Sequence, residues 1–414
     1  MKPLSIKEGK HFIEDIPLSV LVDKFGTPII VYSKRQIIEN IEKFRKAFSI
    51  FSDHEAHYAV KANYNPNILE ILKQNGIGAD AANPNEAKLA VQIGFDKKMI
   101  TVTPNNLTRE ELNFLVKEKF IVNFDDEIQY SIVENKVDLF SIRINPGIGK
   151  GEFKGITTGG KNSKFGTSPD KAKLAYEKAK KDGVERFGIH MHTGSNVLDP
   201  QFFKESSLAF FKISKIISKE VGIRFEYLDI GGGYGVPYQP YVEDLDIDRV
   251  AQNIKSNLML PEINKSLGSF KLITEPGRFM VANSAIILSK VTNVKKTDRN
   301  FIGTNLSFNT MIRHALYGAK HHFEIMDKLS GKYKKFIITG QACENTDRLG
   351  ENIPLIEPRL DDVLITYTAG AYITSMSSNY NLLGRPMEIL VDGSKVKIIR
   401  KPDDLPSILG PFLT

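Results

Sequence analysis

Residues able to do chemistry stand at the ends of several short apolar runs. Lys61 ends such a run in HYAVKANYN, and Glu275 follows another in LITEPGRF. A lysine withdrawn from water has a lowered pKa and can form a Schiff base with a carbonyl compound. A lysine at such a position can equally be a surface residue whose stem packs on apolar neighbours.

The alternation around Lys61 bears on this choice. Tyr58 and Val60 fall on one face of the run, while Ala59 and Lys61 fall on the other. Because successive side chains of a strand point to opposite faces, this pattern is compatible with an inward-pointing Lys61.

Two histidines in GIHMHTGSN invite comparison with a metal site. Residues two apart on a strand share a face, so His190 and His192 could chelate an ion together. A zinc site needs a third protein ligand, and no other strand end supplies a histidine or a cysteine. We therefore expect no metal, with one imidazole stacked on an aromatic ring and the other packed in the wall. A buried Glu275 needs a partner, either Arg278 or a cation such as a protonated pyridine nitrogen.

A glycine cluster in DIGGGYG predicts an anion site. Gly231, Gly232 and Gly233 offer backbone N–H groups at a tight turn, which suits a phosphate. Ser195 could add a hydroxyl and Arg278 a charge-assisted hydrogen bond. Such clusters are also common in ordinary loops, and this one lacks the third glycine and downstream acid of the dinucleotide fingerprint.

The elements that must position these residues alternate between strands and helices. Eight apolar or β-branched runs lie near residues 57–60, 77–80, 100–103, 121–124, 140–144, 187–191, 226–230 and 271–274. Polar residues follow most of them, as barrel enzymes arrange at the carboxyl ends of their strands. We therefore expect an α/β protein with a (β/α)8 TIM-type barrel, the alternative being an open doubly wound sheet.

Two of the intervening helices have clear boundaries. Asn65-Pro66 and Asn83-Pro84 combine a capping asparagine with a proline suited to the first helical position. The segments 68–76 and 86–94 each end in glycine, as helices commonly do. These signals predict two short β/α units.

The sequence pattern changes after about residue 284, where short strand-like segments replace the alternation of strands and helices. The segments AIILSKVTNV, KKFIITG, DVLITYT and MEILVDGSKVKIIR read as strands separated by turn residues. We expect a mostly β C-terminal domain, sandwich-like or barrel-like, over 284–414. The barrel would span 37–283, and residues 1–36 would join the β part.

Composition narrows the class of protein. The 414 residues are 41% hydrophobic and 25% charged, close to average for a globular chain. The net charge is +7, but lysines alternate with acids, so we expect no nucleic-acid partner. Apolar runs are too short for a membrane span, no signal peptide is evident, and the chain has one cysteine. We expect a cytoplasmic protein without membrane attachment.

These motifs together resemble the diaminopimelate decarboxylases, from about residue 25 to the C-terminus. That family has the alanine-racemase-like (fold type III) architecture and uses pyridoxal 5′-phosphate. The motifs, in family order, are VKAN (60–63), the glycine-rich segment 144–166, HMHTGSN (190–196), DIGGGYGVPY (229–238), EPGRFMVANS (275–284), MIRHALYGAKHHF (311–323), ACENTD (342–347) and AGAYITSMSSNYN (369–381).

The resemblance implies a role for each motif. Lys61 would carry the cofactor, His192 would stack on its ring, and Glu275 would face the pyridine nitrogen. The phosphate would be held by Ser195, Gly231, Gly232, Gly233 and the turn Glu275, Pro276, Gly277, Arg278. Cys343 would reprotonate the carbanion left after CO2 loss, delivered from the other subunit of a homodimer with a shared active site. Tyr372 would contact the cofactor and the substrate from the C-terminal domain.

The implied reaction is decarboxylation of meso-2,6-diaminopimelate to L-lysine and CO2, the last step of lysine biosynthesis. The family's distal binders map onto Arg278, Arg313, Tyr317 and Glu344. Two guanidiniums and a phenol suit a carboxylate, and a neighbouring carboxylate suits an ammonium. Ornithine would leave the arginines facing a bare ammonium.

Departures from the family pattern bear on the shape of the distal pocket. GTNLSFN (303–309), with Asn305, replaces an Asp-Ala-Gly stretch. His314 and Gln341 stand where prolines are common, Asn345 follows Glu344 where a serine is usual, and Asn83 replaces a serine. The alternatives are a decarboxylase of a related basic or D-amino acid, and a non-catalytic relative that binds the cofactor or a partner.

Overall fold

The computed structural model describes residues 2–153, 158–160 and 163–412. The chain divides into two compact units. One comprises residues 40–236 and 244–280, and the other comprises residues 1–39, 237–243 and 281–414. The domain boundaries expected from the sequence remain a prediction.

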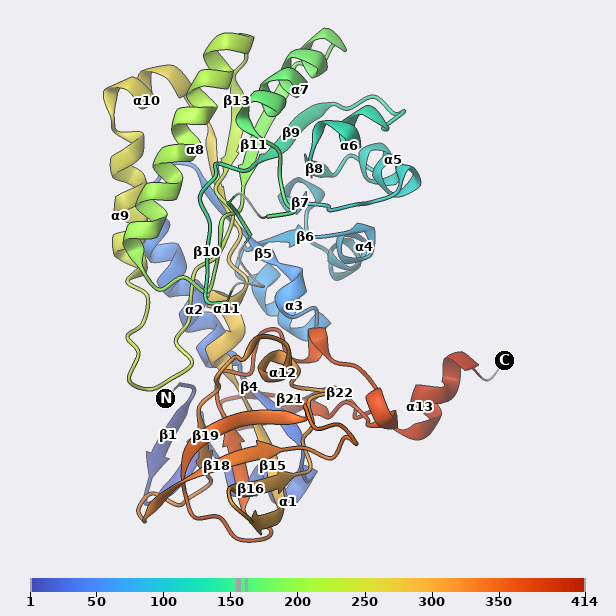
Figure 1. Ribbon diagram of the computed structural model, residues 1–414. Coiled ribbons are helices and arrows are strands. Elements are labelled where there is room, and N and C mark those ends of the chain that lie inside the picture. Colours follow the sequence, from blue (N-terminus) through green and yellow to red (C-terminus); the bar gives the residue numbers. More distant parts are fainter. Residues whose placement is uncertain (1, 154–157, 161–162, 413–414) are drawn as a thin grey trace. The chain divides into compact units, whose positions relative to one another are not determined.

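The first unit is built on a closed barrel of eight parallel strands (Figure 1). Each expected run corresponds to one strand: β5 (His54–Ala59), β6 (Gly78–Ala81), β7 (Ile100–Val102), β8 (Ile121–Phe124), β9 (Leu139–Ile144), β11 (Arg186–Met191), β13 (Phe225–Asp229) and β14 (Lys271–Thr274). The barrel closes because β14 pairs with β5, as in Leu272↔His54. The expected barrel is confirmed, and the open-sheet alternative was wrong.

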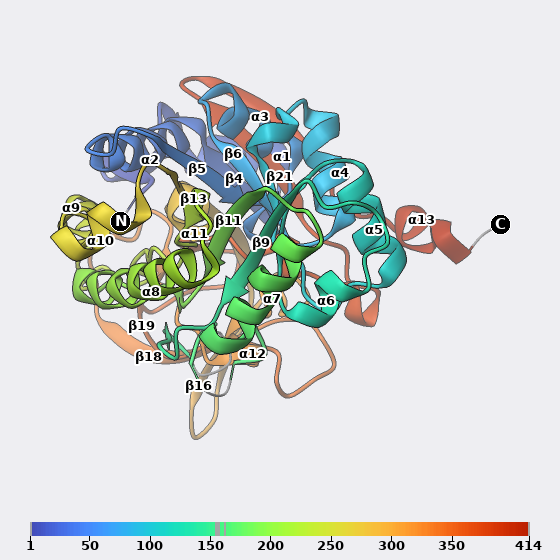
Figure 2. The same cartoon turned by 90° about the horizontal axis from the view of Figure 1, so that it is seen from above.

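Helices surround the strands, as the view along the barrel shows (Figure 2). They are α2 (Lys34–Phe48), α3 (Pro66–Gln74), α4 (Pro84–Ile93), α5 (Arg109–Lys117), α6 (Glu127–Ser131), α7 (Pro169–Lys181), α8 (Pro200–Val221), α9 (Ile247–Leu258) and α10 (Pro261–Leu267). Helices on the outside and side chains on the inside bury both faces of the parallel strands. This explains why the strands read as continuous apolar runs.

The predicted helix boundaries at the first two units are confirmed. The Asn65 side chain accepts the N–H of Asn67, and Asn83 accepts those of Asn85 and Glu86, while proline follows each cap. Gly94 ends α4 in the left-handed conformation, at φ 89°. Because asparagine is as good a cap as serine, Asn83 preserves the local structure at this departure.

The second unit is mostly β, as expected. A nine-stranded sheet contains β4 (Ile29–Ser33), β15 (Ala285–Lys296), β16 (Asn300–Thr304), β17 (Phe323–Ile325), β18 (Tyr333–Thr339), β19 (Arg348–Ile356), β20 (Val363–Thr366), β21 (Met387–Asp392) and β22 (Lys395–Arg400). A smaller sheet joins β1 (Leu4–Lys7), β2 (Lys10–Ile13) and β3 (Ile16–Pro17).

Strand β4 comes from the N-terminal segment yet lies between β15 and β21. It pairs antiparallel with β15 (Ile287↔Ile30) and parallel with β21 (Ile389↔Val31). Ile29, Val31, Ile286, Leu288 and Ile389 share one buried apolar cluster. Burial of this surface ties the two ends of the chain into one core.

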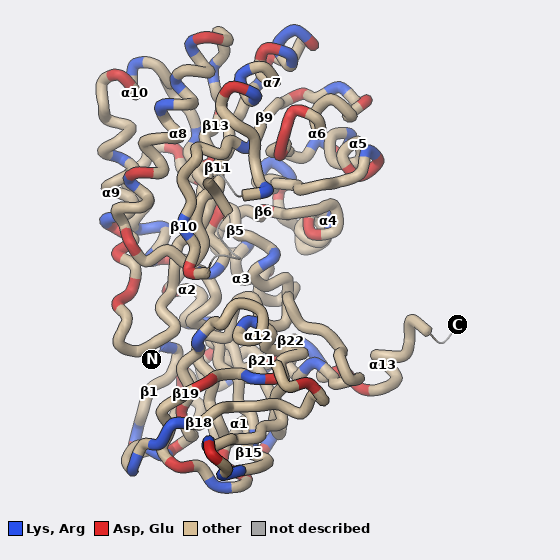
Figure 3. Tube along the Cα trace, in the orientation of Figure 1, with Lys and Arg blue, Asp and Glu red and all other residues tan. Residues whose placement is uncertain are grey.

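Basic and acidic residues are interspersed along both units (Figure 3). Among the described helices, none combines the length and apolarity needed to cross a bilayer.

Candidate active site

Three buried carboxyl groups converge inside the barrel at the carboxyl ends of its strands. Asp80 lies on β6, Asp229 ends β13 and Glu275 directly follows β14. Each is at most 2% exposed. Three carboxylates cannot all remain charged so close together without a strong cost.

Of the three carboxyl groups, Glu275 is the one whose environment favours the negatively charged form. Burial and the neighbouring Glu275 charge raise the pKa of Asp80 to about 8, and they raise the pKa of Asp229 well above its usual value. Burial pushes the pKa of Glu275 upwards as well, but contacts with His190 and His192 outweigh it and leave that pKa well below normal. Within the cluster, the ionised form is therefore favoured at Glu275 and the protonated form at Asp80 and Asp229.

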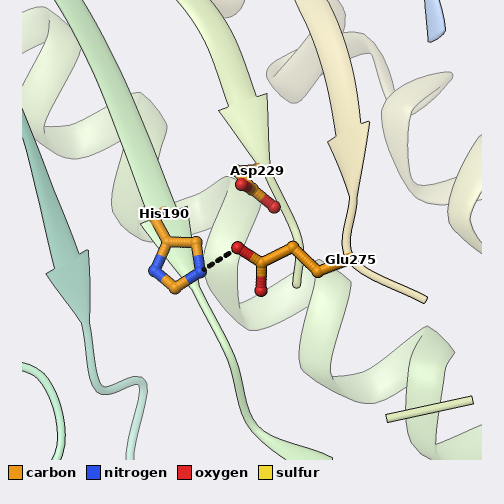
Figure 4. A group of neighbouring side chains, drawn as sticks. All are labelled: His190, Asp229 and Glu275. Atoms are coloured by element: carbon orange, nitrogen blue, oxygen red, sulfur yellow. Dashed lines mark ion pairs between the residues drawn. The ribbon is translucent and has the colours of Figure 1, made fainter. Parts of the chain in front are cut away.

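His190, Asp229 and Glu275 form the centre of this cluster (Figure 4). His190 Nε2 approaches Glu275 Oε1 to 3.2 Å without the alignment of a hydrogen bond. Ligand atoms of all three residues lie within 4.8 Å of one another. The third ligand considered from the sequence was a histidine or a cysteine, whereas the groups that reach His190 here are two carboxyl groups. The raised pKa of Asp229 favours its protonated form, and metals bind the carboxylate form.

His192 is neutral and held in one orientation. Its Nδ1 accepts the N–H of Gly232 at 3.1 Å and lies 3.3 Å from Glu275 Oε2. Burial lowers the pKa of His192 to about 4. A neutral, fixed imidazole presents a flat face, which suits stacking on an aromatic ring.

A ladder of polar side chains inside the barrel supports Glu275. The Thr103 hydroxyl donates to Glu275 Oε1 at 3.3 Å and accepts from Asn123 Nδ2 at 3.2 Å. Asn123 Oδ1 in turn accepts the hydroxyls of Ser141, at 2.7 Å, and Tyr227, at 2.8 Å. No role was predicted from the sequence for these supporting residues.

Lys61 lies beside the acidic cluster rather than on a strand. Strand β5 ends at Ala59, and Lys61 occupies a 3₁₀ turn, Val60–Ala62. Its Nζ donates to Asp80 Oδ2 at 3.3 Å, and its side chain is 44% exposed. The expected strand alternation and desolvation were therefore wrong at this residue. A turn frees the side chain from the pleat and leaves it accessible.

The glycine loop and the turn after β14 are packed together. Glu275 N donates to Gly231 O at 2.8 Å, and Pro276 O accepts the N–H of Ala59 at 3.4 Å. A Cβ on Gly232 would lie 2.1 Å from the Glu275 carbonyl oxygen, so only glycine fits. The N–H groups of Gly231 and Gly232 already donate to Asp229 and His192. The N–H groups of Gly231 and Gly232 therefore hold the side chains of Asp229 and His192 in place. They are not available as donors to a phosphate in this arrangement.

The remaining predicted barrel residues lie on the same loops. Gly277 and Arg278 are buried, and Arg278 begins α11 (Arg278–Val281). Ser195 is half-buried in the short strand β12 (Gly194–Ser195), which pairs with β10 (Lys150–Gly151). Part of the glycine-rich segment 144–166, residues 154–157 and 161–162, lies outside the described residues.

The other predicted residues belong to the second unit. Cys343 and Glu344 are exposed on a loop that is anchored by side chains. Asn381 Oδ1 accepts the N–H of Cys343 at 2.7 Å, and the buried Asp347 accepts that of Ala342 at 2.8 Å. The loop therefore presents its thiol from a fixed backbone.

Tyr372 and Arg313 are held in contrasting ways. Tyr372 has φ 58°, a strained conformation for a bulky side chain that often marks function. Arg313 begins the short helix α12 (Arg313–Tyr317) and is 1% exposed, whereas Tyr317 at its end is half-buried. The position of Arg313 is thus set by packing within its own unit.

Most departures from the family pattern are used structurally. Asn305 Nδ2 donates to the Thr27 carbonyl oxygen, and its Oδ1 accepts the N–H of Lys290. His314 Nδ1 donates to Ala319 O at 2.9 Å, closing the turn after α12. Gln341 N donates to Ser307 Oγ at 2.9 Å, a bond that proline could not make. These side chains serve the scaffold of the second unit.

Comparison with known proteins identifies the family. Residues 34–282 match the family described as "Pyridoxal-dependent decarboxylase, pyridoxal binding domain". The diaminopimelate decarboxylase of Thermoplasma acidophilum is 39% identical over 400 residues, covering 96% of both chains. That of Methanothermobacter thermautotrophicus is 36% identical over 94% of this chain and 92% of the relative. The chain belongs to the diaminopimelate decarboxylases.

The fold agrees with this family across the whole chain. The structure of the diaminopimelate decarboxylase from M. jannaschii in complex with L-lysine covers 100% of this chain and 98% of its own, with a TM-score of 0.91 and 28% identity. The family is pyridoxal-dependent, so the barrel must accommodate that cofactor.

The residues of the barrel fit pyridoxal phosphate. An ionised Glu275 suits a protonated ring nitrogen, and the neutral His192 suits a ring face. Within the described residues, Asp80 Oδ1, Asp229 Oδ2 and both His190 nitrogens are buried without a hydrogen-bond partner. Buried polar atoms of this kind are typical of a site built for a ligand. Lys61 places a primary amine beside Asp80, and a lysine amine can form a Schiff base with a carbonyl compound.

Proposed function

We propose that this chain decarboxylates meso-2,6-diaminopimelate to L-lysine and CO2 in the last step of lysine biosynthesis. The observation that carries the proposal is 39% identity to a diaminopimelate decarboxylase along 96% of the chain. The bond between the α-carbon and one carboxylate breaks, CO2 leaves, and a proton takes its place.

Pyridoxal phosphate, when bound, supplies an electron sink for the pair left behind as CO2 departs. We assign its covalent attachment to Lys61, beside Asp80. Ser195, Gly233, Gly277 and Arg278 would hold the phosphate through hydroxyl, backbone and guanidinium donors.

Glu275 and His192 would tune and align the cofactor. The ionised Glu275 would keep a proton on the ring nitrogen, which strengthens electron withdrawal. The Thr103 hydroxyl, which donates to Glu275 Oε1 at 3.3 Å, helps to hold that carboxylate in place. His192 would cover one ring face and exclude water from it.

Recognition of the far end of the substrate would fall to charged residues of opposite sign. Arg278, Arg313 and Tyr317 suit the distal carboxylate, and Glu344 suits the distal ammonium. Tyr372 would contact both cofactor and substrate. Substrates without a distal carboxylate would leave the guanidiniums unmatched, and this disfavours ornithine and lysine.

Cys343 would deliver the proton to the α-carbon. The thiol is exposed on a loop whose backbone is fixed by Asn381 and Asp347, so it can act beyond its own chain. We propose a homodimer in which Cys343 and Glu344 act in the other subunit's active site. A cytoplasmic location agrees with this role, because a reducing compartment keeps the thiol free.

The test is quantitative product analysis with cofactor-loaded protein. We expect equal amounts of L-lysine and CO2 from meso-diaminopimelate, and neither product from the Lys61→Ala variant. Release of CO2 without lysine, or equal turnover by the variant, would refute the proposal. Efficient turnover of a different basic amino acid instead would show that the residues assigned to the distal end of the substrate were assigned wrongly.

A further inference from the structure

Arg313 is a fully buried cation with a neutral partner. Only 1% of the residue is exposed, and Nη1 lies 3.0 Å from His321 Nε2. Burial of a guanidinium is costly unless its N–H groups are hydrogen-bonded. The nature of the acceptor on His321 therefore matters to how Arg313 is held.

The tautomer of His321 follows from its second contact. Its Nδ1 lies 2.9 Å from the carbonyl oxygen of Tyr367, which can only accept, so Nδ1 must carry the hydrogen. Nε2 of the neutral ring then has a lone pair, and it accepts an N–H from Arg313, which can only donate. His321 is itself 1% exposed, so water does not compete for either nitrogen.

Tyr238 packs against both members of this pair. Its ring centroid lies 4.5 Å from the Arg313 guanidinium carbon and 4.9 Å from the His321 ring, which meets it edge-on at 78°. The aromatic face attracts the cation without removing its charge. The guanidinium of Arg313 is thus contacted by the Nε2 lone pair of His321 and by the ring face of Tyr238.

The loop between Arg313 and His321 is rigidly closed. Gly318 adopts the left-handed conformation at φ 72°, and its N–H donates to His314 O at 2.8 Å. His314 Nδ1 donates back to Ala319 O. These hydrogen bonds close a turn after α12, and the turn brings His321 next to Arg313 at the start of that helix.

A neutral acceptor has a consequence that a carboxylate would not have. An aspartate or glutamate in place of His321 would orient Arg313 but would also neutralise it. The imidazole lone pair orients the guanidinium without itself placing a negative charge beside it.

We propose that His321 is a positioning residue that fixes Arg313 for recognition of the substrate's distal carboxylate. This inference rests on the proposed function, since it assigns Arg313 to that carboxylate. His321 touches neither cofactor nor substrate in this account, and it acts through Arg313 alone.

Two substitutions separate the contacts of His321. Asparagine can replace the Nδ1–H bond to Tyr367 but is too short to reach Arg313. Glutamine can place an amide oxygen near the position of Nε2 and so restore the acceptor. His322→Asn is the matched control, since the half-buried His322 contacts Glu324 instead, at 2.9 Å.

The readout is binding of L-lysine and of cadaverine to the cofactor-loaded enzyme by calorimetry, with kcat and KM for meso-diaminopimelate. Cadaverine has the same chain and amino groups as lysine but no carboxylate. For His321→Asn we expect L-lysine binding and KM to weaken about ten- to hundredfold, the range for a buried hydrogen bond to a charged group. Cadaverine binding and kcat should change less than about threefold. His321→Gln and His322→Asn should stay near wild type in all four quantities.

The inference is overturned if His321→Asn binds L-lysine like wild type, if cadaverine binding falls equally, or if glutamine fails to rescue. Should His321→Asn not fold, Tyr238→Leu replaces it, with the same selective loss of L-lysine binding expected and unchanged binding contradicting the proposal. Failure of the proposed function looks different: the wild-type enzyme itself would form no lysine, and both proposals would fall.

Discussion

Asp229 and Glu275 bring carboxyl oxygens within 4.8 Å of one another inside the barrel, yet their pKa values shift in opposite directions. Burial and the Glu275 charge raise the pKa of Asp229, while contacts with His190 and His192 outweigh burial and lower that of Glu275. Of the two carboxyl groups, Glu275 is therefore the one that favours the ionised form.

Replacing each carboxyl group by its amide, in Glu275→Gln and Asp229→Asn, should show that the two residues differ in charge. Glu275→Gln removes the charge, and loss of a buried charge partner costs about 3–5 kcal/mol, which corresponds to a fall in kcat of about 10²–10⁴. Asp229→Asn replaces a group whose raised pKa favours the neutral form, so it should lower kcat less than about tenfold. Steady-state kinetics, with cofactor content measured after dialysis, checks both. Equal losses in the two variants would contradict the assignment.

Removal of the Cys343 thiol should slow proton delivery and leave bond cleavage intact. General acid catalysis typically contributes about 10²–10⁴-fold, so kcat of Cys343→Ala should fall within that range. Rapid-quench measurement should still find CO2 released quickly in the first turnover, with lysine appearing late. A variant that forms lysine at the wild-type rate would rule out Cys343 as the acid.

The raised pKa of Asp80 predicts a pH dependence of stability in the cofactor-free protein. Its pKa rises from 3.8 to about 8, through burial first and the Glu275 charge second, so the folded state binds more protons between those values. The free energy of unfolding must therefore fall as pH rises through this window, by on the order of 5 kcal/mol. Asp80→Asn should abolish that part of the decline.

Urea unfolding at pH 5 and pH 8 measures this effect. Asp298→Asn is the control, because it removes the same charge from an exposed position between β15 and β16. A decline in wild type that Asp80→Asn and Asp298→Asn both leave unchanged would contradict a protonated Asp80.

The cap on α4 predicts a local stability effect independent of catalysis. Asn83 accepts two backbone N–H groups, at 2.9 Å from Asn85 and 3.1 Å from Glu86. Asn83→Ala should lower the free energy of unfolding by about 1 kcal/mol, whereas Asn83→Ser should change it by less than about 0.5 kcal/mol. Denaturant melts compare the two, and an alanine variant as stable as the serine variant would disprove the capping role.

The sequence was most informative where local pattern and topology agree. Each barrel strand is a buried apolar run bounded by turn or cap residues, so its position could be predicted closely. Residues at strand ends then had to meet, because parallel strands in a barrel share one carboxyl-end face. This is why His192, Glu275 and the glycine loop were expected together.

Other features depend on contacts that no local pattern encodes. Thr103, Ser141 and Tyr227 look like ordinary strand residues, and only the closed barrel brings them to Asn123 and Glu275. Strand β19 was missed because Gly350 and Pro354 interrupt it. The partnership of His321 with Arg313 requires the folded turn between them.

Competition among substrates tests the central claim most directly. Cofactor-loaded enzyme would receive isotopically labelled meso-diaminopimelate together with unlabelled ornithine, lysine and arginine at equal concentration, with labelled and unlabelled products distinguished by mass spectrometry. We predict L-lysine and CO2 from diaminopimelate, with no putrescine, cadaverine or agmatine above the Lys61→Ala background. Formation of any of these amines in preference to lysine would contradict the account.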